Sequence, residues 1–295
     1  MKYRKLGKSS ISVFEIGFGT WGIGGSYKNS IGYGPTEDEE TLKALLYAQD
    51  HGVNFYDTAP LYGLGHSEKM LGKAFQHCRE KVVISTKVGI KDFSGGLDFS
   101  PQNIVDSLNQ SLKRLRTDYV DALLLHSPPI EILKSGHAIT QLELLQRAGK
   151  VRLIGISGKT PSDCLEAISL YQFDLIREFV LSDTTGKATV ENVQYLMDIL
   201  FTEFDPSDFA LHFHDTFGQA EDNLKCGLDN GITTFDASTG GIGGCPFSPG
   251  AKGNIATHKA VSIINDLGFS TGINKAKLDD AGKFINLALS NIQIS

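Results

Sequence analysis

Residues 119–125, Tyr-Val-Asp-Ala-Leu-Leu-Leu, form a short and nearly continuous apolar segment, which is the main sequence evidence for the fold class. Nearly continuous apolar segments are typical of parallel strands that are covered on both faces. Similar segments recur along the whole chain, at residues 14–18, 53–56, 82–85, 119–125, 151–156, 179–181, 209–213 and 232–235. The sequence therefore predicts a parallel α/β protein.

Stretches with helical periodicity separate these segments. One begins at Ser100-Pro101, which reads as an N-cap residue followed by a first-turn proline. Its apolar residues recur at helical spacing, at Ile104, Leu108, Leu112 and Leu115. Repeated strand–helix units of roughly 25–40 residues predict one domain, a single (β/α)₈ TIM barrel over residues 1–295. Residues 1–12 precede the first strand and are expected to form a small hairpin at the barrel bottom.

An open doubly wound sheet is the alternative fold. Residues 17–22, Gly-Phe-Gly-Thr-Trp-Gly, do not have the glycine spacing of a dinucleotide fingerprint. This departure favours the barrel.

Composition narrows the class of protein. The net charge of −6 is mild and no Lys/Arg run suggests nucleic acid or a membrane surface. No apolar run approaches the roughly 20 residues of a membrane span, and the first residues lack a signal-peptide pattern. The four cysteines, Cys78, Cys164, Cys226 and Cys245, show no C-x-x-C pairing, which is typical of a reducing compartment. We expect a cytoplasmic protein with a small-molecule substrate.

A first group of polar residues follows the early strands. Asp57, Lys87 and His126 end predicted strands, and Tyr62 lies in the loop after Asp57. Strand ends meet at one rim of a barrel, so these side chains are expected to converge. A tyrosine can protonate a carbonyl oxygen as hydride arrives at carbon, and a nearby ammonium group favours that proton transfer. The aspartate would keep the buried lysine charged, and the histidine would orient the carbonyl.

Motifs in residues 1–176 resemble those of the aldo-keto reductases. They are Tyr3-Arg4-Lys5-Leu6-Gly7, Ile16-Gly17-Phe18-Gly19-Thr20-Trp21, Asn54-Phe55-Tyr56-Asp57-Thr58-Ala59, Tyr62-Gly63, His66-Ser67-Glu68, Ser111-Leu112-Lys113-Arg114-Leu115, Asp118-Tyr119-Val120-Asp121 and Gly149-Lys150-Val151-Arg152. The resemblance implies NADPH-dependent carbonyl reduction with Asp57, Tyr62, Lys87 and His126 as the catalytic tetrad. It also implies that Ser157 holds the nicotinamide amide.

A second group lies in the later part of the chain. His212 and His214 alternate on a predicted strand, so both side chains point to one face and could chelate a divalent ion. Asn254 could add an oxygen ligand. A glycine-rich loop around Cys245 could close over a ligand and bring the thiol to it. An H-x-H pair alone often binds nothing, so the loop is needed for the argument.

Residues 178–295 resemble 3-hydroxy-3-methylglutaryl-CoA lyase. The matching motifs are Leu181-Ser182-Asp183-Thr184-Thr185-Gly186, His212-Phe213-His214-Asp215-Thr216-Phe217-Gly218-Gln219-Ala220, Phe235-Asp236-Ala237-Ser238 and Gly243 through Thr257. The resemblance implies cleavage of an acyl-CoA with a divalent metal such as Mg²⁺, Mn²⁺ or Zn²⁺. His212, His214 and Asn254 would be the metal ligands, Cys245 the catalytic cysteine and Asp183 an active-site carboxylate. His258 departs from the pattern, which usually has an acidic residue there.

The two resemblances meet near residues 172–180, and five units plus three would make one hybrid barrel of a 1–176 part and a 177–295 part. Neither site is complete. The basic motif that grips NADPH in the reductases is missing after residue 176, where Lys252 and Lys259 are weak substitutes. The first strand also lacks the Asp and Arg of the lyase family. Weak NADPH-dependent carbonyl reduction is favoured, with metal-dependent lysis and a recombined or engineered barrel without efficient activity as alternatives.

Overall fold

The structure is a computed structural model, and the chain divides into two compact units, Met1–Arg177 and Glu178–Ser295. It describes residues 3–6, 9–14, 16–25, 34–92, 94, 96–158, 167, 169–171, 175–176, 179–183, 185–202, 204–206, 209–242 and 253–292. The boundary between the units falls inside the junction predicted near residues 172–180. Each unit is described by itself.

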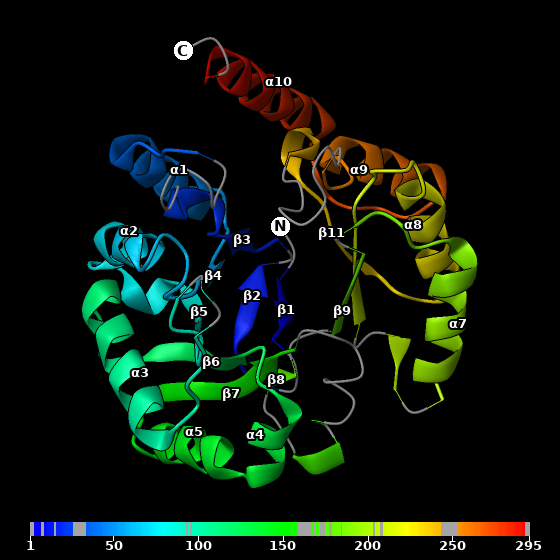
Figure 1. The fold of residues 1–295 in the computed structure, drawn as a ribbon. Coiled ribbons are helices and arrows are strands. Elements are labelled where there is room, and N and C mark those ends of the chain that lie inside the picture. The colour runs from blue at the N-terminus through cyan, green and yellow to red at the C-terminus, as the bar shows by residue number, and fades with distance from the viewer. Residues whose placement is uncertain are drawn as a thin grey trace. The chain divides into compact units, whose positions relative to one another are not determined.

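A parallel six-stranded sheet forms the first unit (Figure 1). Its strands follow chain order and are β3 (Phe18–Gly19), β4 (Phe55–Asp57), β5 (Val83–Val88), β6 (Val120–His126), β7 (Val151–Ser157) and β8 (Leu175–Ile176). Every residue of β5 is buried, as is every residue of β6 except the last. Burial on both faces explains why these strands read as continuous apolar segments.

Helices of the first unit cover this sheet. They are α1 (Asp38–Asp50), α2 (His66–Phe75), α3 (Pro101–Leu115), α4 (Ile130–Ser135) and α5 (His137–Arg147), with short 3₁₀ turns at Gly22–Gly24 and Arg79–Lys81. The predicted start of α3 is confirmed, because the Ser100 side chain accepts a hydrogen bond from the Asn103 N–H and Pro101 takes the first turn. The predicted apolar face of α3 is buried in the core of the unit.

An N-terminal hairpin is present as predicted, but it extends past residue 12 to Phe14, and the first strand of the six-stranded sheet lies at Phe18–Gly19 instead of residues 14–18. Strands β1 (Tyr3–Lys5) and β2 (Ser12–Phe14) pair antiparallel, and Asn54 bonds the backbone of Ser12 and Phe14. Leu6 and Ile11 pack against Ala122 and Leu153, which lie near the starts of β6 and β7. The hairpin therefore covers the amino-terminal ends of these strands.

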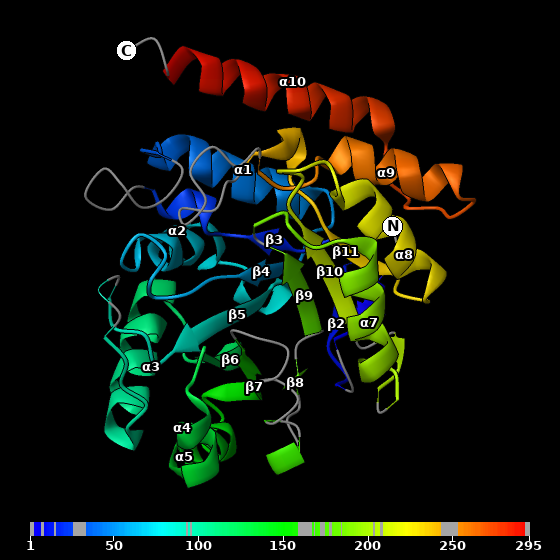
Figure 2. The same ribbon diagram turned by 45° about the vertical axis from the view of Figure 1, so that its right-hand side comes forward.

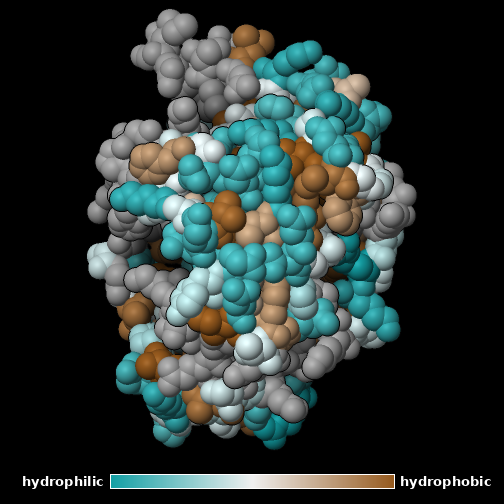
Figure 3. All heavy atoms as spheres, turned by 90° about the vertical axis from the view of Figure 1, so that its right-hand side faces the viewer, coloured by the Kyte–Doolittle hydropathy of each residue, from teal (hydrophilic) through white to brown (hydrophobic). Residues whose placement is uncertain are grey.

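A second, three-stranded parallel sheet forms the later unit, with β10 (Phe209–Phe213) between β9 (Phe179–Asp183) and β11 (Thr234–Asp236) (Figure 2). Its helices are α7 (Val190–Leu200), α8 (Ala220–Asp229), α9 (Thr257–Asp266) and α10 (Lys275–Ile292), with a 3₁₀ turn at Thr239–Gly241. Thr189 and Asn192 form a reciprocal capping box at the start of α7. The side that carries α7 and α8 is mostly hydrophilic (Figure 3).

The α/β class with parallel sheets is confirmed, but a single closed barrel is not. Apart from the two-stranded β1–β2 hairpin, the described strands form two parallel sheets, one of six strands and one of three, instead of one series of five plus three. The prediction missed β8, which pairs with Gly155 and Ile156 of β7. This strand has only two residues, and charged residues at 174, 177 and 178 flank it, so no apolar segment marks it. No helix in the described ranges is long and apolar enough to cross a membrane.

Candidate functional site

Four predicted site residues lie at the carboxyl edge of the six-stranded sheet. Asp57 is the last residue of β4, Lys87 the penultimate residue of β5, His126 the last of β6 and Ser157 the last of β7. His126 and Ser157 are register partners on adjacent strands. The parallel arrangement brings these side chains to one edge because all the strands end there.

Lys87 is the centre of this group. Its ammonium Nζ donates to Asp57 Oδ2 at 2.8 Å, to the Thr58 carbonyl at 2.9 Å and to the Tyr62 hydroxyl at 3.2 Å. Its side chain is only 4% exposed. These acceptors take all three donors of the ammonium group, which compensates for its burial. The structure thus brings Asp57, Lys87 and Tyr62 together as the sequence predicts.

Tight backbone packing holds the loop that carries Tyr62. Gly63 has φ +60° and lies against the Gly24 backbone, where a Cβ would clash with the Gly24 carbonyl. The Trp21 ring meets the Tyr62 ring edge-on at 5.0 Å between centroids. The position of the Tyr62 phenol is therefore fixed both by the packing of the loop backbone and by the contact of its ring with Trp21.

His126 is held in its neutral form. Burial, with a further contribution from the Lys87 charge, lowers the pKa of its imidazole from 6.5 to about 4, although Asp57 partly opposes the change. A neutral imidazole can donate a hydrogen bond to a carbonyl oxygen at neutral pH without adding charge to the site.

The depressed pKa of His126 predicts a pH dependence of stability. The unfolded chain takes up a proton near pH 6.5, whereas the folded chain does so only near pH 4, so protonation favours unfolding between these values. The contribution of His126 is complete above pH 6.5 and is lost as the pH falls toward 4. Between pH 7 and pH 5 the free energy of unfolding should fall by about 2 kcal/mol more in the parent than in His126→Gln. Urea unfolding measures this, and an imidazole NMR signal for His126 titrating near pH 6.5 would contradict it.

The predicted metal pair lies in the second unit. The rings of His212 and His214 are 5.3 Å apart, and His212 Nδ1 is 3.5 Å from Asp236 Oδ2. His214 is buried, and its Nδ1 has no hydrogen-bond partner within the described part of the chain. Burial and the neighbouring His212 lower the pKa of His214, while Asp183 opposes this. Neutral imidazoles are the form that binds metals.

The other residues of this group are only partly assembled. Asn254 pairs with His214 through an isolated backbone bridge, but its amide nitrogen donates to the Ile242 carbonyl at 3.0 Å. The Asp183 carboxylate accepts from the Ala188 N–H and the Thr185 hydroxyl, so it holds its own loop. Cys245 lies outside the described residues. In the ranges that the structure describes, no group of three or more His, Cys, Asp or Glu side chains could hold a metal ion.

Three buried hydroxyls lie next to Lys87, Asp57 and Tyr62, the group that we call the lysine centre. These hydroxyls were not predicted from the sequence. Thr20, Thr58 and Ser67 are fully buried and hydrogen-bond to one another. Thr58 directly follows Asp57, and Thr20 follows the last residue of β3. The positions of Thr20 and Thr58 directly after strand ends, where the site was expected, were the available signal.

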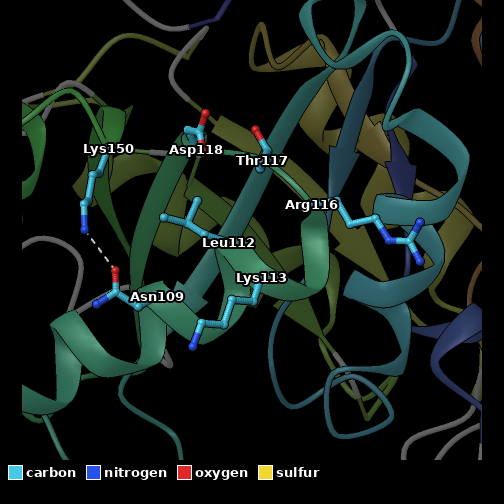
Figure 4. Close-up of a pocket in the computed structure, with 7 residues that line it drawn as sticks. All are labelled: Asn109, Leu112, Lys113, Arg116, Thr117, Asp118 and Lys150. Carbon is cyan, nitrogen blue, oxygen red and sulfur yellow. Dashed lines mark hydrogen bonds between the residues drawn. The ribbon is translucent and has the colours of Figure 1, made fainter.

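A surface groove lies at the other edge of the first sheet. It is lined by Asn109, Leu112, Lys113, Arg116, Thr117, Asp118 and Lys150 (Figure 4). Lys150 donates to Asn109 at 3.0 Å, and Arg116 points away from the other two basic side chains. Residues 116–118 and 150 precede β6 and β7, so the groove is separate from the lysine centre.

Comparison with known proteins gives two family matches. Residues 15–210 match the model of the Aldo/keto reductase family, and residues 162–285 match the HMGL-like model. Because the first match covers more than half of the chain, the chain belongs to the aldo/keto reductase family, and its later part is similar to the HMG-CoA lyases. The predicted resemblance to both families is confirmed.

Individual relatives divide in the same way. Aldo-keto reductase YhdN of Bacillus subtilis is 36% identical over 166 residues, which are 53% of this chain and 47% of that protein. Hydroxymethylglutaryl-CoA lyase YngG of the same organism is 41% identical over 117 residues, 40% of this chain and 39% of that protein. This chain thus spans less than half of the length of either relative. An aldo-keto reductase from Klebsiella pneumoniae, solved in complex with NADPH, shares the fold with TM-score 0.52 and 22% identity over 75% of this chain and 70% of its own.

Proposed function

We propose that this protein reduces the carbonyl group of a small aldehyde or ketone with NADPH, at a low rate. The observation that carries the proposal is the Lys87 ammonium, which contacts both the Asp57 carboxylate and the Tyr62 hydroxyl. A phenol held beside a buried ammonium is placed to donate a proton to a carbonyl oxygen. All four residues of the predicted tetrad belong to the first unit, with Asp57, Lys87 and His126 at the carboxyl edge of one sheet and Tyr62 in the loop after β4.

The chain's own residues divide the work of this reaction. NADPH would supply the hydride to the carbonyl carbon. The Tyr62 hydroxyl donates its proton to the carbonyl oxygen, Lys87 stabilises the phenolate that remains, and Asp57 holds the Lys87 ammonium in place through its ion pair. His126, neutral at pH 7, donates a hydrogen bond that orients the substrate. Ser157 is half-buried next to His126, at a position that fits a contact to the nicotinamide amide.

The proposed low rate rests on weak binding of NADPH. Lys259, one of the two substitutes for the missing basic motif, pairs with Asp215 at 3.1 Å and lies 3.7 Å from Glu221. Its charge is therefore already balanced by carboxylates. Lys252 lies outside the described residues. Positioning of the hydride donor accounts for much of the catalysis of such a reaction, so a loosely held cofactor lowers the rate.

Trp21 provides a direct test of cofactor binding. It is the only tryptophan of the sequence, and its ring contacts Tyr62. NADPH bound at the lysine centre should quench its fluorescence, with half-saturation between about 10 µM and 1 mM, the range of ordinary weak enzyme sites. Tyr62→Phe should keep the quenching, because it leaves the ring in place. Fluorescence that does not change at millimolar NADPH would rule out the proposed function.

Metal-dependent carbon–carbon bond cleavage of an acyl-CoA is the second candidate. It is favoured by the proximity of the His212 and His214 rings and by the position of Asp236, which can hold His212 Nδ1 and leave Nε2 for a metal. The residues present fit a two-histidine site better than a complete catalytic centre. Water would fill the remaining positions around the ion.

Metal binding can be measured without reference to activity. We expect the parent to bind one Zn²⁺ or Mn²⁺ weakly and His212→Ala/His214→Ala to lose at least tenfold in affinity, because both imidazole ligands are gone. Equilibrium dialysis followed by elemental analysis gives both values, with His66→Ala as a control because His66 lies in the first unit. Equal binding by the parent and the double variant would exclude the histidine pair. A protein that binds neither NADPH nor metal but unfolds cooperatively would support the third alternative, a recombined fold whose site residues are inactive.

A further inference from the structure

The hydroxyls of Thr58, Ser67 and Thr20 form a hydrogen-bonded chain of fixed direction, which we call the hydroxyl chain. The Asp57 carbonyl can only accept, so the Thr20 hydroxyl donates to it, at 2.7 Å. The Thr20 oxygen is then free to accept, and Ser67 donates to it at 2.7 Å. Because Ser67 has one proton, Thr58 must donate to Ser67, at 2.9 Å. All three residues are 0% exposed.

The hydroxyl chain ends on the backbone carbonyl of Asp57, the residue whose carboxylate binds Lys87. The Asp57 carbonyl receives the Thr20 backbone N–H at 2.9 Å in addition to the Thr20 hydroxyl. At its other end is the Thr58 side chain, and the backbone carbonyl of the same residue accepts from Lys87 Nζ at 2.9 Å. The hydroxyl chain therefore links two consecutive residues that both contact Lys87, Asp57 through its carboxylate and Thr58 through its carbonyl.

Ser67 adds a contact to the third member of the group. Its backbone N–H donates to the Tyr62 carbonyl at 3.2 Å. Ser67 belongs to the first turn of α2, so one buried residue ties the start of this helix to the Tyr62 loop and to the end of β3. Buried hydrogen bonds in series strengthen one another, and a break leaves the remaining hydroxyls without partners in a place that water cannot reach.

We propose that the hydroxyl chain positions the Asp57 carboxylate on the Lys87 ammonium, and that Thr20 and Ser67 are positioning residues of the reductase centre. The claim that Thr20 and Ser67 affect catalysis rests on the proposed function, whereas the claim that they hold the Asp57–Lys87 ion pair does not. A shift of the Asp57 carboxylate well below 1 Å would be enough to weaken its contact with Lys87, because Lys87 makes its three contacts at 2.8–3.2 Å.

Two substitutions at one position separate the hydroxyl from the shape of the side chain. Thr20→Val removes the hydroxyl and keeps the volume, and Thr20→Ser keeps the hydroxyl. Ile104→Val, in α3, serves as a control for a buried truncation elsewhere. The first measurement is the acylation rate of Lys87 by acetic anhydride at several pH values, read by mass spectrometry. It requires no cofactor and no turnover.

We expect Thr20→Val and Ser67→Ala each to raise Lys87 acylation at least threefold, and Thr20→Ser and Ile104→Val to leave it within twofold of the parent. The combined Thr20→Val/Ser67→Ala variant should change no more than the stronger single variant, because both break one chain. If Thr20→Ser matches Thr20→Val, or if Thr20→Val matches Ile104→Val, the proposal is overturned.

Steady-state kinetics with an aldehyde provide the second measurement. Thr20→Val should lower kcat about tenfold with KM within threefold, and Thr20→Ser should recover most of the loss. A parent without any turnover would contradict the proposed function, while the acylation rates would still decide whether the hydroxyl chain holds the ion pair. An active parent with unchanged kcat in Thr20→Val would overturn the positioning role.

Discussion

Tyr62→Phe should lower the kcat of NADPH-dependent aldehyde reduction by about 100- to 10,000-fold, the usual range for loss of a general acid. The substitution removes the hydroxyl that lies 3.2 Å from Lys87 Nζ and keeps the ring that packs against Trp21. NADPH affinity should stay within threefold, because the variant loses no other contact of the loop. Single-turnover kinetics followed by NADPH absorbance, together with Trp21 fluorescence, separate the two effects.

A matched phenol elsewhere tests whether the effect is local. Tyr47→Phe changes a tyrosine that is 62% exposed on α1 and should leave kcat unchanged. Equal kcat in the parent and Tyr62→Phe would show that another group delivers the proton, and His126 would then be the first alternative to examine.

Asp121→Ala should lower the free energy of unfolding by about 3–5 kcal/mol, the cost of breaking a buried ion pair from one side. The Asp121 side chain is fully buried on β6 and binds Arg79 at 2.6 Å and Arg152 at 2.9 Å. It also accepts the Ile84 backbone N–H at 2.9 Å, so it connects β6 to β5. Removal of the carboxylate leaves the Arg79 guanidinium buried without its counter-charge.

The control for this prediction is Asp118→Ala, three residues earlier in an exposed turn, which should change the free energy of unfolding by less than about 0.5 kcal/mol. Urea unfolding followed by circular dichroism gives both values. A loss below about 1 kcal/mol in Asp121→Ala would mean that water or a relaxed Arg79 replaces the carboxylate.

The longer strands β5, β6, β7 and β10 could be predicted because most of their residues are buried. β5, β6, β7, β9 and β10 follow apolar segments closely, and the N-cap at Ser100 locates the start of α3. β8 was not predicted, because its two residues lie between charged residues and are too few to show a periodic apolar pattern. The sheet arrangement also could not be derived, because strand count alone does not show which strands pair.

Part of the candidate site could likewise be predicted from the sequence, and part of it could not. Residues at strand ends could be predicted, since a parallel sheet brings them to one edge whatever the intervening loops do. The hydroxyl chain could not be predicted, because Thr20, Thr58 and Ser67 meet only when β3, β4 and α2 are folded, and serines and threonines are mostly exposed in folded proteins. The functional roles of all predicted site residues stay predictions, namely Asp57, Tyr62, Lys87, His126, Ser157, His212, His214, Cys245 and Asn254.

The contacts of Lys87 have a consequence for how such a chain can arise. Asp57, Thr58 and Tyr62 all precede Lys87 in the sequence, and Thr20 and Ser67, which brace them, do so as well. The bonds to the ammonium that the described residues make are therefore encoded in one contiguous gene segment, which ends well before the junction at residues 177 and 178. A genetic crossover at that junction would exchange everything that follows and leave these bonds unbroken, so this cluster can pass intact from one parent protein to its descendants.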